Sequence, residues 1–353
     1  MIRILAVDDS ALVRKLLGQV FAAEPDFEVE FARTGLEALE RLAEFAPDVV
    51  TLDVHMPGLD GLATLDRIML ERPCPVVMLS ALTAEGAETT LQALRLGAVD
   101  FVAKPGGAVS LKLDEFAPEL VAKVRSAAKS HIRPTLRLQE RVRHRIGGSP
   151  RPRVRERALV PATGAGLVLV GVSTGGPPAL EHLLTPLPAT FPWPIVIVQH
   201  MPATFTGPLS RRLDGICAID VKEVSEPVRL EPGCAYIGRG DSDLVVTRRS
   251  GSLCAESVPS DPQHRWHPSA ERLVRSAMDV VPASQLVGIL MTGMGDDGAQ
   301  AMTELHAAGG RTIAEAEETA VVWGMPGELV KAGGADYVVP VQKIAERLQK
   351  LTP

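Results

Sequence analysis

Residues 2–10 read IRILAVDDS, an apolar run that ends in two aspartates and a serine. A run that is apolar almost throughout is typical of a strand buried on both faces of a parallel sheet. Ser10 follows this run and can cap a helix whose apolar stripe includes Leu12, Leu16 and Val20. The start of the chain therefore predicts a strand followed by a helix. The two acids come too early for a secretory signal.

The same pattern continues to residue 129. Amphipathic segments separate four further short apolar runs, at 27–31, 48–54, 75–80 and 99–105. Five successive β-α units predict an open parallel sheet with helices on both faces and right-handed crossovers. We therefore expect residues 1–129 to form a flavodoxin-like (βα)5 domain.

A second alternating segment spans residues 166–353. Buried strands are predicted at 166–172, 194–199, 286–292, 311–316 and 336–340. The runs CAYIGRG and DLVVTR flank Asp241-Ser242, which predicts a β-hairpin at that dipeptide. We expect a doubly wound, mostly parallel α/β domain with a β-hairpin.

Residues 130–165 separate these two domains and have a different composition. Between His131 and Arg157 there are nine arginines and two glutamates, a local charge of +7, and glycines and prolines interrupt the segment. A solvated linker is the preferred interpretation. A contact surface for an acidic partner or for nucleic acid is the alternative.

Composition restricts the class of protein. The 353 residues are 46% hydrophobic and 23% charged, which excludes a mainly disordered chain, and the net charge of −6 gives no argument for a polyanion partner of the whole chain. The four cysteines form no C-x-x-C pair, so we expect buried free thiols in a reducing compartment. No apolar run reaches the ~18–20 residues that span a bilayer, and we expect a cytoplasmic protein without membrane insertion.

Polar side chains follow four strands of the first domain, at the sheet edge where ligands bind in such folds. Asp8 and Asp9 follow the first strand, Asp53 the third, Ser80 the fourth and Lys104 the fifth. Clustered carboxylates with open positions favour Mg²⁺, beside which Asp53 could attack phosphorus. Ser80 and Lys104 could then bind phosphoryl oxygens. Each residue alone could be a cap or a turn former, but their joint placement predicts a phosphoryl-transfer site.

These motifs, VDDS, LDVHMPGLDG, VVMLSA and DFVAKP, make residues 1–125 similar to the receiver domain of two-component response regulators. The resemblance implies that a histidine kinase supplies a phosphoryl group to Asp53. It also implies that Mg²⁺ binds the three aspartates and the backbone carbonyl of His55, where relatives usually carry an acid. Phe101 stands at the aromatic switch position, and simple packing is the alternative for it.

The second domain carries a different set of polar residues at its strand ends. Ser173 follows the strand at 166–172, His200 follows 194–199, and Asp296 and Asp297 follow 286–292. A hydroxyl, an imidazole and a carboxylate at one edge are the components of a serine hydrolase. The run GVSTG also matches the nucleophile elbow G-x-S-x-G, which is weak evidence alone.

Other interpretations of this edge remain open on the residues alone. Ser-Thr-Gly-Gly after a strand could bind phosphate, although it lacks the lysine of a P-loop. His264 and His267 could compete with His200 as the base, and either aspartate could be a turn former.

The motifs GVSTGG, QHMP and LMTGMGDDGA make residues 165–350 resemble the catalytic domain of chemotaxis-type protein-glutamate methylesterases, the CheB family. The resemblance implies Ser173 as nucleophile, His200 as base and Asp297 as the carboxylate of the triad. It also implies backbone amides near Thr174 and Met294 as oxyanion donors.

Together the two resemblances imply an esterase that phosphorylation activates. It would hydrolyse glutamyl methyl esters on chemoreceptor helices and deamidate glutamine, with Mg²⁺ in the receiver and no cofactor in the esterase domain. The unphosphorylated receiver is expected to cover Ser173. His267 stands where the family suggests arginine. A DNA-binding regulator and an inactive signalling scaffold are the alternatives. Nucleic acid is disfavoured because no helix-turn-helix pattern follows the receiver.

Overall fold

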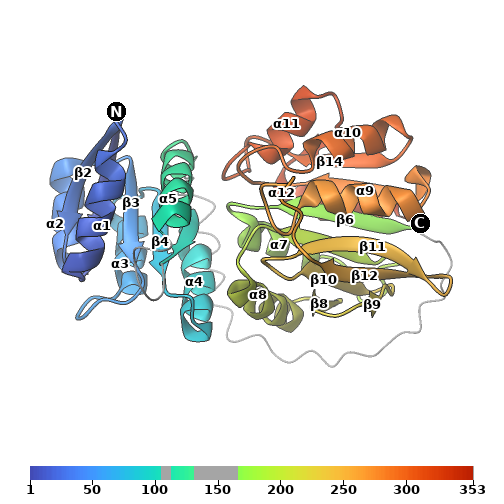
Figure 1. Ribbon diagram of the computed structural model, residues 1–353, viewed down its shortest axis with the longest axis horizontal. Helices are drawn as coiled ribbons and strands as arrows, with labels where there is room; N and C mark the ends of the chain where they lie inside the picture. Colours follow the sequence, from blue (N-terminus) through green and yellow to red (C-terminus); the bar gives the residue numbers. More distant parts are fainter. Residues whose placement is uncertain (105–112, 131–165, 353) are drawn as a thin grey trace. The chain divides into compact units, whose positions relative to one another are not determined.

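The computed structural model describes residues 1–104, 113–130 and 166–352, and the chain divides into two units, Met1–Gly148 and Ser149–Pro353 (Figure 1). The boundary falls within the predicted linker. Apart from Ser130, that linker lies outside the described residues.

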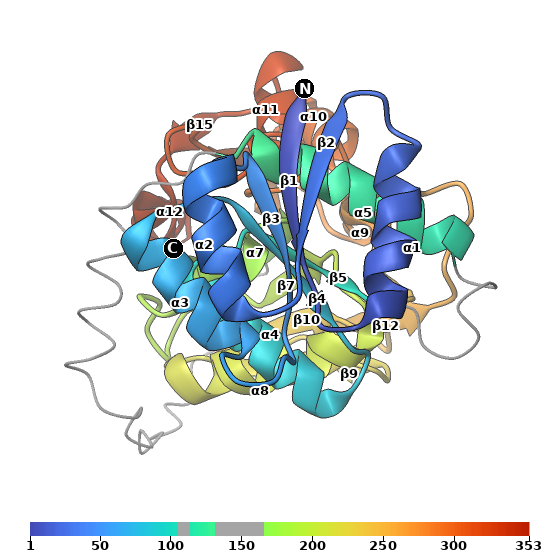
Figure 2. The same ribbon diagram turned by 90° about the vertical axis from the view of Figure 1, so that its left-hand side faces the viewer.

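The first unit alternates strands and helices, as predicted. Its elements are β1 (Ile2–Val7), α1 (Ala11–Ala22), β2 (Phe27–Ala32), α2 (Gly35–Phe45), β3 (Val49–Asp53), α3 (Gly61–Glu71), β4 (Val76–Ser80), α4 (Ala84–Leu96), β5 (Asp100–Ala103) and α5 (Leu113–Ala128). The sheet is parallel with the order β2-β1-β3-β4-β5, which confirms the flavodoxin-like prediction. Helices α1 and α5 cover one face, and α2, α3 and α4 cover the other (Figure 2).

Local sequence signals explain the first helix. The Ser10 side chain accepts a hydrogen bond from the backbone N–H of Val13, as an N-cap does. Leu16 and Val20 are buried against the sheet, but Leu12 is 62% exposed, so its placement in the buried stripe was wrong. Leu12 lies in the first turn of α1, where the neighbouring Ala11 is exposed as well.

The second unit is larger. Its elements are β6 (Leu167–Val172), α7 (Gly176–Leu184), β7 (Ile195–Gln199), α8 (Ala203–Ile216), β8 (Asp220–Val224), β9 (Val228–Arg229), β10 (Cys234–Gly238), β11 (Asp243–Arg249), β12 (Ser252–Val258), α9 (Ala270–Val280), β13 (Leu286–Leu290), α10 (Ala299–Ala307), β14 (Arg311–Glu315), α11 (Met325–Lys331), β15 (Tyr337–Val339) and α12 (Val341–Leu351), with a 3₁₀ turn at Ala283–Gln285. Seven parallel strands form one sheet in the order β15-β14-β13-β6-β7-β10-β8.

The hairpin of this unit lies elsewhere than predicted. Strand β10 is buried at every residue and pairs in parallel with β7 and β8, as an apolar run in a large sheet does. Strand β11 instead pairs with β12 in a separate antiparallel sheet with β9. The hairpin turn is therefore Ser250-Gly251, both with positive φ, and the prediction of a hairpin at Asp241-Ser242 was wrong.

The strand order defines where a ligand would bind in the second unit. Strand β7 lies on one side of β6 and β13 on the other, so the order reverses at β6. The crevice beyond the carboxyl ends of these strands is the expected binding position in such a sheet. Helices α9 and α10 pack together, and the small sheet contacts α9 through β11.

All four cysteines are buried and free, as expected. Within the described residues, no helix is both long and apolar enough to cross a membrane.

Candidate active site

Ser173 is the first residue after β6. Its backbone N–H donates to the carbonyl of Thr292 at 3.0 Å, and its own carbonyl accepts from the N–H of Gly176, the first residue of α7, at 2.8 Å. Gly175 between them has φ +77°, a conformation that favours glycine. The serine is therefore held on a tight strand-to-helix turn.

The segment after β13 packs directly on this turn. A Cβ at Gly293 would lie 2.8 Å from the Cβ of Ser173, so only glycine fits there. The Thr292 hydroxyl donates to the carbonyl of Thr174 at 2.9 Å, and the Thr292 N–H donates to the buried carboxylate of Glu315 at 2.8 Å. Thr292 thus joins the serine turn to strands β13 and β14.

His200 follows the neighbouring strand β7. Its backbone N–H donates to the carbonyl of Val172, the residue before the serine, at 3.1 Å. The side chain of Gln199 donates to the carbonyl of Ser173 at 3.0 Å. The structure therefore brings the backbones of Ser173 and His200 together at adjacent strand ends.

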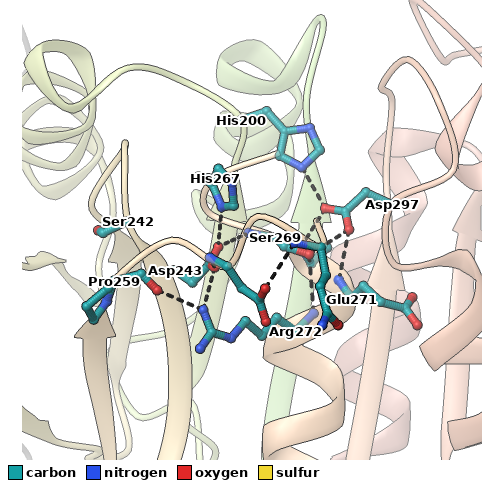
Figure 3. A network of polar contacts seen from close by, with 12 residues as sticks. His200, Ser242, Asp243, Pro259, His267, Ser269, Glu271, Arg272 and Asp297 are labelled. Carbon is teal, nitrogen blue, oxygen red and sulfur yellow. Dashed lines mark hydrogen bonds and ion pairs between the residues drawn. The ribbon is translucent and has the colours of Figure 1, made fainter. Parts of the chain in front are cut away.

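The carboxylate of Asp297 accepts four hydrogen bonds at the N-terminus of α9 (Figure 3). The donors are His200 Nε2 at 2.8 Å, Ser269 Oγ at 2.8 Å, and the backbone N–H groups of Ala270 at 2.6 Å and Glu271 at 3.1 Å. Burial acts to raise the pKa of Asp297, but the bonds from His200 and the two amides outweigh it and lower the pKa below its usual value.

The contact with Asp297 assigns the roles of the two imidazole nitrogens. A neutral imidazole carries one N–H, and the ionised Asp297 carboxylate can only accept, so Nε2 carries the proton. Nδ1 is then the acceptor. It is buried and has no hydrogen-bond partner among the described residues. Within the described part of the chain, the structure gives no hydrogen bond between the Ser173 hydroxyl and His200. Catalytic hydrogen bonds are often long before substrate binds and become shorter in the enzyme–substrate complex.

The competing residues lie differently. Asp296 is exposed, whereas the side chain of Asp297 is 7% exposed. His267 Nδ1 lies 3.1 Å from Asp243 rather than on Asp297. Thr174 is buried and Met294 half-buried in the two segments that flank Ser173.

Sequence reasoning missed two residues here. The indole of Trp266 stacks on the His200 ring, with centroids 5.2 Å apart and planes 11° from parallel. Asp243 is fully buried and accepts from the N–H of Ser269, the N-cap of α9, at 3.0 Å and from Arg272 at 2.6 Å (Figure 3). In the sequence, Trp266 is marked only by its position between the basic residues Arg265 and His267 in a polar loop.

The first unit holds an acidic cluster at the carboxyl ends of β1 and β3, where its strand order reverses. One carboxylate oxygen from each of Asp8, Asp9 and Asp53 lies within 4.8 Å of the others. Lys104 Nζ lies 2.7 Å from Asp8 and 2.8 Å from Asp53. Burial raises the pKa of Asp53 despite the opposing Lys104 charge, and Asp8 raises it further. An all-oxygen donor set of this kind fits Mg²⁺.

The remaining predicted residues of this unit are placed as follows. Ser80 is buried, and its hydroxyl accepts from Thr90 at 2.7 Å and contacts the carbonyl of Gly86 at 3.3 Å. Phe101 is 3% exposed, with Lys123 Nζ 5.0 Å from its ring centroid. The N–H of His55 donates to Asp53 at 3.2 Å, and no contact of its carbonyl is described.

Comparisons with known proteins find a match for each of the two domains. Residues 4–113 match the response regulator receiver domain, and residues 168–348 match CheB methylesterase. The chain is therefore a two-domain response regulator whose second domain has a hydrolase fold.

Relatives of known name extend over the whole chain. One is a protein-glutamate methylesterase/protein-glutamine glutaminase of Rhodopseudomonas palustris, 59% identical over 98% of this chain and 96% of that protein. Another, from Rhodospirillum rubrum, is 49% identical over 99% of this chain and 95% of its own. The crystal structure of the Thermotoga maritima CheB methylesterase catalytic domain covers 54% of this chain and all of that one, with 38% identity and a TM-score of 0.52. The chain belongs to the CheB methylesterase family.

Proposed function

We propose that this chain is a protein-glutamate methylesterase and protein-glutamine glutaminase that phosphorylation of its receiver domain activates. Residues 1–129 are the regulatory domain, 130–165 the linker and 166–353 the catalytic domain. The observation that carries the proposal is the buried Asp297–His200 pair beside the tight turn of Ser173. The names of relatives that span the whole chain support the same function.

The proposed reaction begins with attack of the Ser173 hydroxyl on the glutamyl ester carbonyl. His200 Nδ1 takes the hydroxyl proton, and Asp297 stabilises the resulting imidazolium through Nε2. Backbone N–H groups of Thr174 and Met294 stabilise the oxyanion. The proton then passes to the leaving methoxide, which departs as methanol. Water hydrolyses the acyl-enzyme by the same steps in reverse order, and a glutamine substrate would release ammonia instead.

The proposed control acts through Asp53. A histidine kinase supplies the phosphoryl group, and Asp8, Asp9, Asp53 and the His55 carbonyl would hold Mg²⁺, which neutralises charge during transfer. Lys104 already contacts Asp8 and Asp53 and would pair with the phosphoryl group. Ser80 would exchange its present bonds for one to a phosphoryl oxygen, and Phe101 would respond as the switch residue. The modified receiver then leaves Ser173 accessible.

The proposed substrates are methylated chemoreceptor helices, and the proposed location is the cytoplasm. The receiver match supports a kinase partner, and the methylesterase match supports a receptor substrate. Four free buried thiols agree with a reducing compartment.

The test measures methanol release from methylated receptor with and without a small phosphodonor. The wild type should release methanol faster with the phosphodonor, and Asp53→Asn should keep only the basal rate. Equal wild-type rates in the two conditions would rule out control by Asp53. Absence of methanol in both would rule out the esterase.

A further inference from the structure

We propose that Trp266 is a positioning residue for the general base, because its indole fixes the plane of the His200 imidazole and so keeps Nδ1 available to Ser173. The inference rests on the proposed function, in which His200 takes the serine proton. It concerns a residue in the loop between β12 and α9 that lies outside the triad.

The His200 ring makes few other polar contacts. Its side chain is 5% exposed, and its one described hydrogen bond joins Nε2 to Asp297 at 2.8 Å. One hydrogen bond at Nε2 still lets the ring tilt about its Cβ–Cγ bond, and Nδ1 has no hydrogen-bond partner among the described residues that would oppose this tilt. The indole, whose plane is only 11° from that of the imidazole, opposes it.

The loop that carries Trp266 is anchored directly after the indole. Its neighbour His267 lies 3.1 Å from the fully buried carboxylate of Asp243, which also receives the N–H of Ser269. The exposed Arg265 places its guanidinium 5.1 Å from the indole centroid. The anchored residues after Trp266 therefore limit how far the indole can move away from the imidazole.

The stack also affects the charge that forms during catalysis. When His200 takes the serine proton, the imidazolium faces an aromatic ring as well as the Asp297 carboxylate, and the ring attracts the cation. The charged groups described around this stack are Asp297 on the imidazole and Arg265 on the indole. Losing the flat ring should therefore lower kcat, while substrate binding should change little.

The experiment compares Trp266→Leu, which keeps an apolar cover without a flat ring, with Trp266→Phe, which keeps the ring. Methanol release from methylated receptor gives kcat and KM, and melting temperatures report folding. We expect Trp266→Leu to lose roughly 3–30-fold in kcat with KM within about twofold, and Trp266→Phe to recover most of the loss. Gln263→Ala, at an exposed position of the same loop where only the backbone N–H makes a described bond, is the matched control and should keep kcat near the wild-type value.

Three results would overturn the inference. They are an unchanged kcat in Trp266→Leu, a loss carried by KM, and an equal loss in Trp266→Phe. If Trp266→Leu melts much earlier than the wild type, Trp266→Met replaces it under the same criteria. A wild type no more active than Ser173→Ala would instead reject the proposed function, so the two failures are distinguishable.

Discussion

The buried carboxyl of Glu315 should make the catalytic domain less stable as the pH rises. Its side chain accepts from the N–H of Thr292 at 2.8 Å and from the hydroxyl of Thr319 at 3.0 Å. Burial raises its pKa to about 7, although these bonds and, to a smaller extent, the charge of His182 act to lower it. An ordinary glutamate in an unfolded chain has a pKa of about 4.3. The folded state therefore binds this proton more tightly, and stability is lost as the pH rises from about 4.3 through 7.

Glu315→Gln should remove that loss. The glutamine oxygen can keep the bond from Thr292, and its NH₂ can donate to Thr319, whose hydroxyl can turn to the Ala316 carbonyl at 3.3 Å. A difference of ~2.7 pKa units means that ionised Glu315 lowers the free energy of unfolding by about 2–4 kcal/mol at pH 8. At pH 5.5 this loss is roughly 2 kcal/mol smaller. The variant should thus be more stable than the wild type, increasingly so at high pH.

Urea unfolding followed by tryptophan fluorescence measures this effect directly. The three tryptophans, Trp193, Trp266 and Trp323, all lie in the second unit, so the signal reports on the catalytic domain. Glu317→Gln is the matched control because Glu317 is exposed, and it should change the free energy of unfolding by less than about 0.5 kcal/mol. The reasoning is refuted if Glu315→Gln destabilises the domain at pH 8, or if its effect does not depend on pH.

Three further predictions concern the two sites. Asp297→Ala should lower kcat for methanol release by ~10⁴, while Asp296→Ala, which changes an exposed neighbour, should stay within about threefold, and similar losses in both would contradict the triad. Thr292→Val should lower kcat roughly tenfold because the bond to the Thr174 carbonyl is lost, and Thr292→Ser should restore it; equal effects of valine and serine would argue against this positioning. Chelating Mg²⁺ should abolish activation by a phosphodonor without changing the basal rate, and persistent activation would count against a metal at Asp53.

Much of this fold follows from short-range patterns. Apolar runs marked the inner strands of both parallel sheets because such strands are buried on both faces, whereas the edge strand β8 was not predicted. The rule that ligands bind at carboxyl strand ends then brought Ser173, His200 and Asp297 to one edge, where the structure joins the last two directly.

The errors arose where pairing depends on distant parts of the chain. A turn signal at Asp241-Ser242 suggested a hairpin, but β10 found its partners in β7 and β8, which no local pattern indicates. Trp266 and Asp243 were missed for a similar reason. The loop of Trp266 has no periodicity. Asp243 is the first residue of β11, and its role depends on tertiary contacts such as its ion pair with Arg272 at 2.6 Å.

The rate of methanol release from methylated receptor by Ser173→Ala tests the central claim most directly. The account predicts a loss of ~10⁴ or more relative to the phosphodonor-treated wild type, with an unchanged melting temperature, because the acyl-enzyme cannot form. A folded Ser173→Ala protein that retained a tenth of the wild-type rate would show that another group attacks the ester, and the proposed mechanism would be wrong.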